Sequence, residues 1–191
     1  GNGKQLLEIW RRKQLEYTWL RTLMDNWTDF DEVTADALRY ATLSMGLSNY
    51  EELARLLMPI YRQHNYFADV PATLQHLRTQ EIPVAILSNG TPEMLATGIE
   101  KTGLSDLVDY VFSASQVQEF KVASSVYQMV IDCLNIEASE VLFFSSNAWD
   151  IAGAKYFGFQ TVWVNRNGQV FEELGIQADW EISNFTEWKN R

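Results

Sequence analysis

Residues 141–150 have the sequence Val-Leu-Phe-Phe-Ser-Ser-Asn-Ala-Trp-Asp, and no other segment is as informative about the fold class. The four apolar residues 141–144 predict a short buried strand, and the segment that starts near Asp150 predicts a helix. In an open α/β sheet, ligands bind at the carboxyl ends of the strands. The polar turn between the two elements is therefore either a binding site or an ordinary helix start in which Ser145 or Ser146 is the N-cap.

The same alternation of strand and helix covers the C-terminal two thirds of the chain. Helices are predicted over 71–80, 92–103, 124–134 and 150–157, and strands over 82–87, 110–113, 141–144, 160–164 and 180–183. Such alternation implies a doubly wound parallel sheet of Rossmann-like type. The N-terminal part predicts only helices, including 31–45 and 50–63. We therefore expect a small helical domain at 1–67 and an α/β core domain at 68–191.

Composition excludes several classes of protein. The 191 residues carry a formal net charge of −10, which argues against nucleic acid as a partner. No apolar run reaches the roughly 18 residues that span a bilayer, and the N-terminus lacks a signal sequence. The single cysteine, Cys133, is expected in a helix core, and His64 and His76 are too far apart in sequence to suggest a zinc site. A cytoplasmic protein without a membrane partner is expected.

Three further features fall where a site in such a sheet would need them. Ser88 and Asn89 follow a predicted strand and precede a helix whose N-cap is Thr91, so they are either anion-binding groups or plain turn residues. Lys121 precedes the helix of Tyr127 and either lies in solvent or compensates a buried carboxylate. Residues 10–19 (Trp-Arg-Arg-Lys-Gln-Leu-Glu-Tyr-Thr-Trp) form a basic cluster that is either a solvated face over a core stripe or part of a site.

Taken together, these motifs resemble one enzyme family. Residues 11–21 (Arg-Arg-Lys-Gln-Leu-Glu-Tyr-Thr-Trp-Leu-Arg) look like the cap-helix signature of the (S)-2-haloacid dehalogenases, which belong to the haloacid dehalogenase (HAD) superfamily. Residues 86–90 (Ile-Leu-Ser-Asn-Gly), 120–121 with Tyr127, 145–150 and 154–159 (Ala-Lys-Tyr-Phe-Gly-Phe) fit that family in the same order. The resemblance covers nearly the whole chain and implies a HAD-type core with a helical cap.

The resemblance also implies a reaction and a role for individual residues. In the family an aspartate displaces halide from a short (S)-2-haloalkanoic acid, and water hydrolyses the resulting aspartyl ester to give the (R)-2-hydroxy acid. By this resemblance Lys121 would keep the nucleophile ionised, Ser88 would bind the substrate carboxylate, and Arg11 and Asn89 would hold the halide. Ser145, Asn147 and Asp150 would orient the lysine, the nucleophile and the hydrolytic water. An apolar wall around the halogen-bearing carbon would be formed by Leu15, Phe30 and Trp149, with Tyr127 nearby.

No cofactor and no metal are expected. Most phosphatases of the superfamily hold magnesium partly through an acidic pair in a Gly-Asp-x-x-x-Asp arrangement after this strand. Here the first acidic position is Ser146, and only Asp150 remains. Magnesium prefers carboxylate and phosphate oxygens, so the loss of one carboxylate argues against a metal-assisted phosphatase.

The chain departs from the family pattern in three places. The family's Asp-x-Tyr-Gly-Thr-like motif, which carries the nucleophile after a first strand, does not occur in the 191 residues. We therefore expect an N-terminal nucleophile segment to be missing and the chain as given to be inactive. Val122 stands where relatives usually have proline, and Arg12 stands where they often have glutamine.

Two other functions are weighed beside the dehalogenase. One is hydrolysis of a related small carboxylate, such as a strained-ring amino acid, and the other is a non-catalytic HAD-like binding protein. The expected partners are a small 2-halocarboxylate substrate and, by resemblance, a second copy in a homodimer.

Overall fold

The computed structural model describes residues 2–62 and 65–189, and the chain forms two compact units. Unit 1 comprises Gly1–Asn65, Ser88–Gly103 and Ser113–Phe120, and unit 2 comprises Tyr66–Leu87, Leu104–Phe112 and Lys121–Arg191. The predicted end of the third helix at Gln63 and the residue His64 lie outside the described residues, and the domain boundary at 67 stays a prediction. Among the described helices, none is long and apolar enough to cross a membrane.

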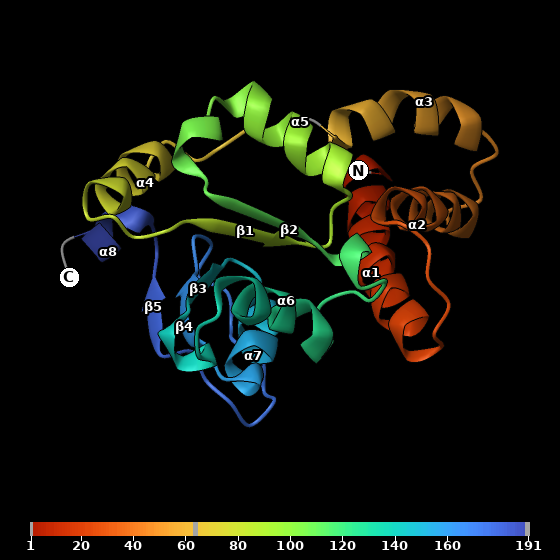
Figure 1. Cartoon of the computed structure of the whole chain (residues 1–191). Helices are drawn as coiled ribbons and strands as arrows, with labels where there is room; N and C mark the ends of the chain where they lie inside the picture. Colours follow the sequence, from red (N-terminus) through yellow and green to blue (C-terminus); the bar gives the residue numbers. More distant parts are fainter. Residues whose placement is uncertain (1, 63–64, 190–191) are drawn as a thin grey trace. The chain divides into compact units, whose positions relative to one another are not determined.

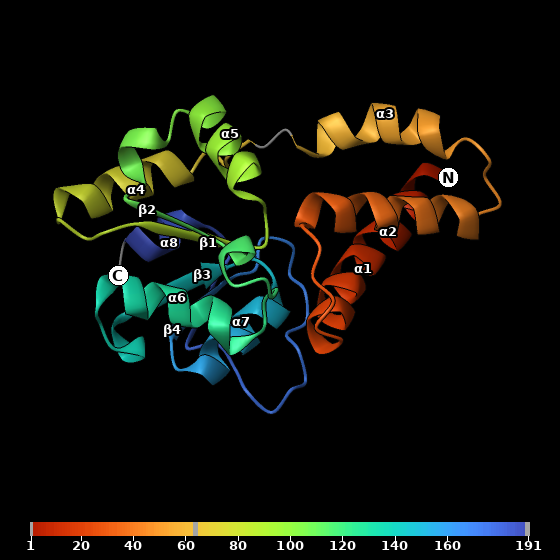
Figure 2. The same cartoon turned by 45° about the vertical axis from the view of Figure 1, so that its right-hand side comes forward.

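Unit 1 is built on a helical core. Its elements are α1 (Asn2–Leu23), α2 (Phe30–Ser44), α3 (Tyr50–Tyr61), α5 (Pro92–Thr102) and the short 3₁₀ helix η2 (Ala114–Gln116). Helix α2 packs against both α1 and α3 (Figures 1 and 2). The Asp29 carboxylate caps α2 by accepting a hydrogen bond from the Glu32 backbone N–H at 2.9 Å. The apolar faces of the three helices form a core of Leu6, Trp10, Ala37, Leu38, Ala41 and Met58.

Unit 2 contains most of the strands. Its first half has α4 (Val70–Thr79), β1 (Ala85–Ser88), η1 (Ser105–Leu107) and β2 (Tyr110–Ser113), and the last residues of both strands belong to unit 1. Its second half has α6 (Ser124–Leu134), η3 (Ala138–Glu140), β3 (Leu142–Ser145), α7 (Ala148–Phe157), β4 (Gln160–Val164), β5 (Trp180–Ile182) and α8 (Phe185–Lys189).

The strands form a parallel sheet of order β3-β4-β5 and a separate pair β1-β2 in the described part of the chain. Leu142 pairs with Gln160, and Val162 pairs with Trp180. Helix α7 packs on β3 and β4, and α6 packs on α7 (Figure 1). The strand-end turn at 145–147 therefore leads directly into a helix, as the sequence predicts for an α/β site.

Most predicted elements are present, and the bounds predicted for 110–113, 124–134 and 160–164 are confirmed. The ends of the other elements are shifted by at most three residues, and three details are wrong. The strand predicted as buried over 141–144 runs over 142–145, and its side chains are only half-buried. Cys133 is exposed, because the buried face of α6 consists of Val126, Tyr127 and Val130. Helix α8 was not among the predicted elements.

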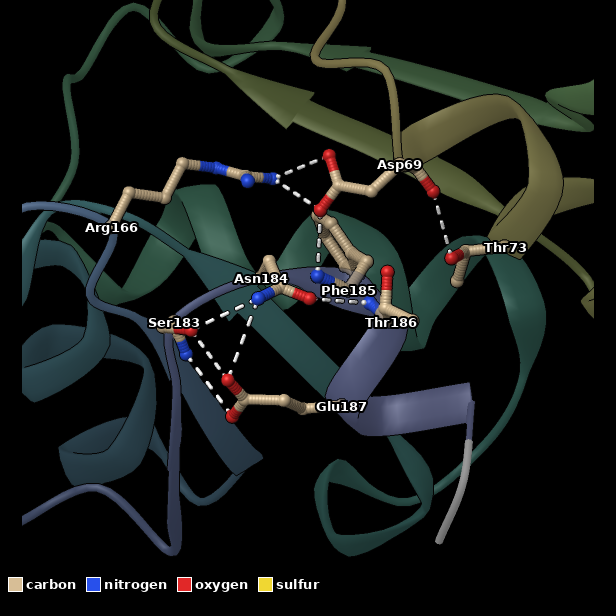
Figure 3. Close-up of polar contacts among 8 residues, drawn as sticks. All are labelled: Asp69, Thr73, Arg166, Ser183, Asn184, Phe185, Thr186 and Glu187. Atoms are coloured by element: carbon tan, nitrogen blue, oxygen red, sulfur yellow. Dashed lines mark hydrogen bonds and ion pairs between the residues drawn. The ribbon is translucent and has the colours of Figure 1, made fainter.

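A polar cluster joins three distant segments of unit 2 (Figure 3). Arg166, after β4, donates to both carboxylate oxygens of Asp69 at 3.0 and 2.9 Å. The backbone N–H of Phe185, at the start of α8, donates to the same carboxylate at 2.7 Å. Burial raises the pKa of Asp69, but the hydrogen bonds from Phe185 and Arg166 outweigh burial, so the net pKa is lowered. This cluster therefore ties α4, α8 and the segment after β4 together.

Asp69→Ala should lower the free energy of unfolding by about 2–4 kcal/mol, because it leaves the Arg166 charge and the Phe185 N–H without their acceptor. Glu8→Ala is the control, since it removes an exposed i,i+4 pair with Lys4 and should cost at most about 0.5 kcal/mol. Urea unfolding at pH 7 measures both values. Equal losses in the two variants would contradict this assignment.

Candidate active site

The centre of the candidate site is a buried cluster of three side chains in unit 2. Lys121, Asp150 and Tyr127 are 6%, 4% and 0% exposed. The Lys121 ammonium lies 3.0 Å from Asp150 Oδ2, and the Tyr127 hydroxyl donates to Asp150 Oδ1 at 3.0 Å. Both carboxylate oxygens thus have a partner. The alternative in which Lys121 lies in solvent is wrong.

Local structure explains why the Asp150 charge is tolerated there. Asp150 lies in the first turn of α7, where the partial positive charge of the helix N-terminus favours a carboxylate. The Lys121 ammonium also lies 4.8 Å from the centre of the Phe143 ring, an arrangement typical of a cation–π contact. Burial, together with the adjacent Asp150 carboxylate, raises the pKa of Tyr127 far above its ordinary value. Tyr127 is therefore a neutral hydrogen-bond donor at any physiological pH.

Gly153 allows these groups to approach α7, one turn beyond Asp150. A Cβ atom at this position would lie 2.6 Å from Val122 Cγ1 and 2.7 Å from the Tyr127 hydroxyl oxygen. The peptide bond between Lys121 and Val122 is cis. Gly153 was not predicted as a site residue, although a glycine inside a helical pattern is a signal of a packing constraint.

The turn between β3 and α7 is held by its own side chains. Ser145 Oγ accepts a hydrogen bond from the Asn147 backbone N–H at 3.2 Å. Asn147, rather than Ser145 or Ser146, is the N-cap residue of α7, and its side chain makes no capping bond. Ser146 is exposed, whereas Asn147 and Trp149 are half-buried. Ser145, Asn147 and Asp150 therefore all lie in the six residues from the end of β3 to the first turn of α7.

A second strand end, in unit 1, carries Ser88 and Asn89. Asn89 is 8% exposed, and Ser88 Oγ accepts from the Gly90 backbone N–H at 3.0 Å. Thr91 caps α5, as predicted, by accepting from the Met94 N–H at 3.2 Å. The unpaired N–H groups at the start of such a helix favour an anion.

The predicted residues of the helical part also belong to unit 1. The exposed Arg11 donates from Nη1 to Gln14 Oε1 at 2.6 Å. Phe30 is buried, its ring centre 6.1 Å from that of Phe120, and Leu15 is half-buried. Their predicted roles remain predictions, as do those of the residues in unit 2. Gln14 is a second residue that the sequence analysis missed.

We also searched the described residues for clusters of side chains that could bind a metal ion. Within residues 2–62 and 65–189, no group of three or more His, Cys, Asp or Glu side chains could hold a metal ion. The two oxygens of Asp150 are already used by Lys121 and Tyr127.

Comparison with known proteins identifies the class of enzyme. Residues 4–158 match the family described as haloacid dehalogenase-like hydrolase. The chain belongs to this family, and its fold is the HAD-type α/β fold.

Within this family, the chain is similar to proteins named as haloacid and haloacetate dehalogenases. The chain is 42% identical to the (S)-2-haloacid dehalogenase of Pseudomonas sp. (strain YL) over 183 residues, which cover 96% of this chain and 79% of that protein. It is 37% identical to haloacetate dehalogenase H-2 of Moraxella sp. (strain B), with 95% and 81% covered. The crystal structure of the L-2-haloacid dehalogenase RSc1362 matches with a TM-score of 0.95 at 34% identity, covering 100% of this chain and 86% of that one.

Gly153→Ala should lower the free energy of unfolding by about 1–3 kcal/mol, although alanine favours helix, because the new methyl group overlaps Val122 and Tyr127. Gly3→Ala in α1 is the control, since a Cβ there meets nothing within 4 Å. Chemical denaturation of both variants gives the comparison. A stabilised Gly153→Ala protein would refute the close approach.

Tyr127 should also make the protein sensitive to alkali. Because its pKa is raised in the folded state, its contribution to stability is complete below its ordinary pKa of about 10 and is lost as pH rises above it. Between pH 10 and 11, the free energy of unfolding should fall more steeply in the wild type than in Tyr127→Phe. The difference between the two slopes should be up to about 1.4 kcal/mol per pH unit. Urea titrations at pH 9, 10 and 11 test this, with the exposed Tyr156→Phe as control. Parallel curves for wild type and Tyr127→Phe would rule it out.

Proposed function

We propose that the protein hydrolyses short (S)-2-haloalkanoic acids to (R)-2-hydroxy acids and halide. The observation that carries this proposal is the buried Lys121–Asp150 pair in a chain that is 42% identical to an (S)-2-haloacid dehalogenase. A fixed ammonium in a poorly hydrated place suits a reaction in which one carboxylate attacks a substrate that bears another.

The proposed reaction has two displacements. A carboxylate oxygen attacks C2 of the substrate, the carbon–halogen bond breaks with its electron pair leaving on the halide, and an aspartyl ester forms with inverted configuration. Water then attacks the ester carbonyl, which releases the hydroxy acid and a proton and restores the carboxylate. The solved structure of the L-2-haloacid dehalogenase from Xanthobacter autotrophicus contains covalently bound chloropropionic acid, and that protein is 31% identical to this chain with a TM-score of 0.91.

The nucleophile in this scheme is an aspartate outside the 191 residues. The Asp-x-Tyr-Gly-Thr-like motif is absent from them, and the most conspicuous buried carboxylate, Asp150, is bound by Lys121 and Tyr127. An attacking carboxylate needs a free oxygen lone pair directed at carbon, which suits Asp150 poorly. Its role in the proposal is to fix Lys121.

Each remaining residue has one proposed task. In unit 2, Lys121 keeps the nucleophile ionised, and Ser145 and Asn147 orient the lysine and the hydrolytic water. In unit 1, Ser88 binds the substrate carboxylate near the α5 N-terminus, and Arg11 and Asn89 hold the departing halide. The residues proposed for the apolar wall are Leu15 and Phe30 of unit 1 and Trp149 of unit 2, with Tyr127 of unit 2 near Trp149's part of it.

No divalent metal takes part in the proposed reaction. Ser146 occupies the position where the phosphatases of the superfamily have their additional acid, and Asp150 already neutralises an ammonium. A substrate with a single carboxylate and no phosphate has little need for magnesium.

We also propose a cytoplasmic homodimer. Along α1 and α2, large apolar side chains are exposed, among them Leu20, Leu23, Met24, Tyr40 and Leu43. Leu20, Met24, Tyr40 and Leu43 border an open groove of about 460 Å³ that also includes the Arg21–Asp36 ion pair. An apolar surface of this kind commonly marks a protein–protein contact.

The test uses the protein made from its complete reading frame, with (S)- and (R)-2-chloropropionate as separate substrates. Chloride and (R)-lactate should form in equal amounts from the (S) isomer alone. Lys121→Met should lower kcat/KM about 10²–10³-fold, as loss of one central electrostatic group does. Lys101→Met, on the exposed side of α5, is the control and should retain full activity.

Three outcomes would overturn or replace the proposal. No chloride from either isomer would refute it, and ring opening of a strained amino acid with release of amine would assign the other hydrolase. Substrate binding without turnover by the complete protein would indicate a binding protein. The 191-residue chain alone should release no chloride above the blank.

A further inference from the structure

Gln14 is a polar side chain in the centre of unit 1. It lies on α1 and is 0% exposed. A buried amide costs free energy unless its hydrogen-bonding groups have partners. Gln14 Nε2 donates to Thr34 Oγ1 at 2.6 Å and to the Tyr61 hydroxyl at 2.7 Å, and its Oε1 accepts from Arg11 Nη1 at 2.6 Å. The amide therefore links three helices to one guanidinium group.

Chemistry fixes the orientation of this amide. Arginine can only donate hydrogen bonds, so the group facing Arg11 must be the amide oxygen. The Thr34 hydroxyl donates its hydrogen to the Phe30 carbonyl oxygen at 2.6 Å, so it can only accept a hydrogen bond from Gln14. Turning the amide over would oppose donor to donor at Arg11 and acceptor to acceptor at Thr34. The Gln14 oxygen is thus held toward Arg11.

The partners of Gln14 are themselves held. The Trp10 indole donates to the Thr34 carbonyl at 2.8 Å, and its ring centre lies 5.5 Å from that of Tyr61. Trp10 is 5% exposed, and Thr34 is fully buried. The acceptor that faces Arg11 is therefore attached to a rigid core.

Arg11 has the opposite character, because its side chain is exposed. A free arginine side chain loses about 2 kcal/mol of conformational free energy when it is fixed in one orientation. A hydrogen bond from a charged donor contributes about 1.5–3 kcal/mol, which is enough to offset that loss. One bond from Gln14 can therefore restrict Arg11 while leaving the other guanidinium N–H groups available.

We infer that Gln14 is a positioning residue that orients the Arg11 guanidinium toward the departing halide. This inference rests on the proposed function of Arg11. Gln14 itself touches neither substrate nor halide. Its effect should therefore disappear when Arg11 is absent, whereas a merely structural role would persist.

A double-mutant cycle on kcat/KM for (S)-2-chloropropionate tests the inference in the protein made from its complete reading frame. Gln14→Met should lower kcat/KM about ten-fold in the wild type and less than two-fold in the Arg11→Met background. Tyr61→Phe, a milder change that removes one partner of Gln14, should show the same pattern with about a three-fold loss.

Thr42→Val is the matched control. Thr42 is a fully buried threonine on α2 whose hydroxyl donates to the carbonyl four residues earlier, as Thr34 does, but it makes no bond to Gln14. Thr42→Val should leave kcat/KM within two-fold. The inference would be overturned if Gln14→Met or Tyr61→Phe lowered kcat/KM by the same factor in the Arg11→Met background as in the wild type. Full activity of Arg11→Met would instead refute the role proposed for Arg11.

A second measurement does not depend on activity. In the 191-residue chain, the Arg11 Nη hydrogens should give separate signals in low-temperature ¹⁵N NMR spectra, because the bond to Gln14 slows rotation about Cζ–Nη. Those signals should merge in Gln14→Met and stay separate in Thr42→Val. Merged signals in the wild type would show that Gln14 does not hold Arg11.

Discussion

Lys121 and Asp150 form an ion pair whose side chains are only 7% and 6% exposed. Removing two charges from water costs several kcal/mol for each, and their attraction offsets this cost only if the remaining polar atoms find partners. Here the Tyr127 hydroxyl takes the second carboxylate oxygen, and the first turn of α7 contributes its favourable field. The pair therefore requires α6, α7 and the segment around residue 121 to be in place together.

This requirement explains several local features of unit 2. Gly153 leaves room for Val122 and the Tyr127 hydroxyl beside α7. The Tyr127 ring packs edge-on against Phe143 and Phe159, 6.1 and 5.8 Å between centres, which fixes the direction of its hydroxyl. The apolar core and the polar cluster thus share one residue. A change that loosens the core around Tyr127 should also loosen the hold on Asp150.

Much of the fold could be predicted from the sequence, because local patterns determine it. The alternation after residue 70 predicts the strands and helices of the HAD-type fold, and Thr91-Pro92 predicts the start of α5. The errors come from tertiary packing. Cys133 lies in a helix as expected, but the sequence does not indicate that it is outside the buried face.

The site was harder to predict from residues alone. Nothing near Lys121 in the sequence indicates its partner 29 residues later, so the local pattern alone favours a solvated lysine over a buried one. The resemblance to dehalogenases favoured the buried alternative. It did not point to Gln14, whose partners Thr34 and Tyr61 lie 20 and 47 residues away. Long-range hydrogen bonds of this kind leave no periodic signal in a single sequence.

The coupling free energy between Lys121 and Asp150 measures how strongly the two buried groups depend on each other. It is obtained from the unfolding free energies of the wild type, Lys121→Met, Asp150→Asn and the double variant. Because each single change leaves one buried group without its partner, we predict that the double variant loses at least about 2 kcal/mol less than the sum of the single losses. A coupling below about 0.5 kcal/mol, which is typical of exposed ion pairs, would contradict the account.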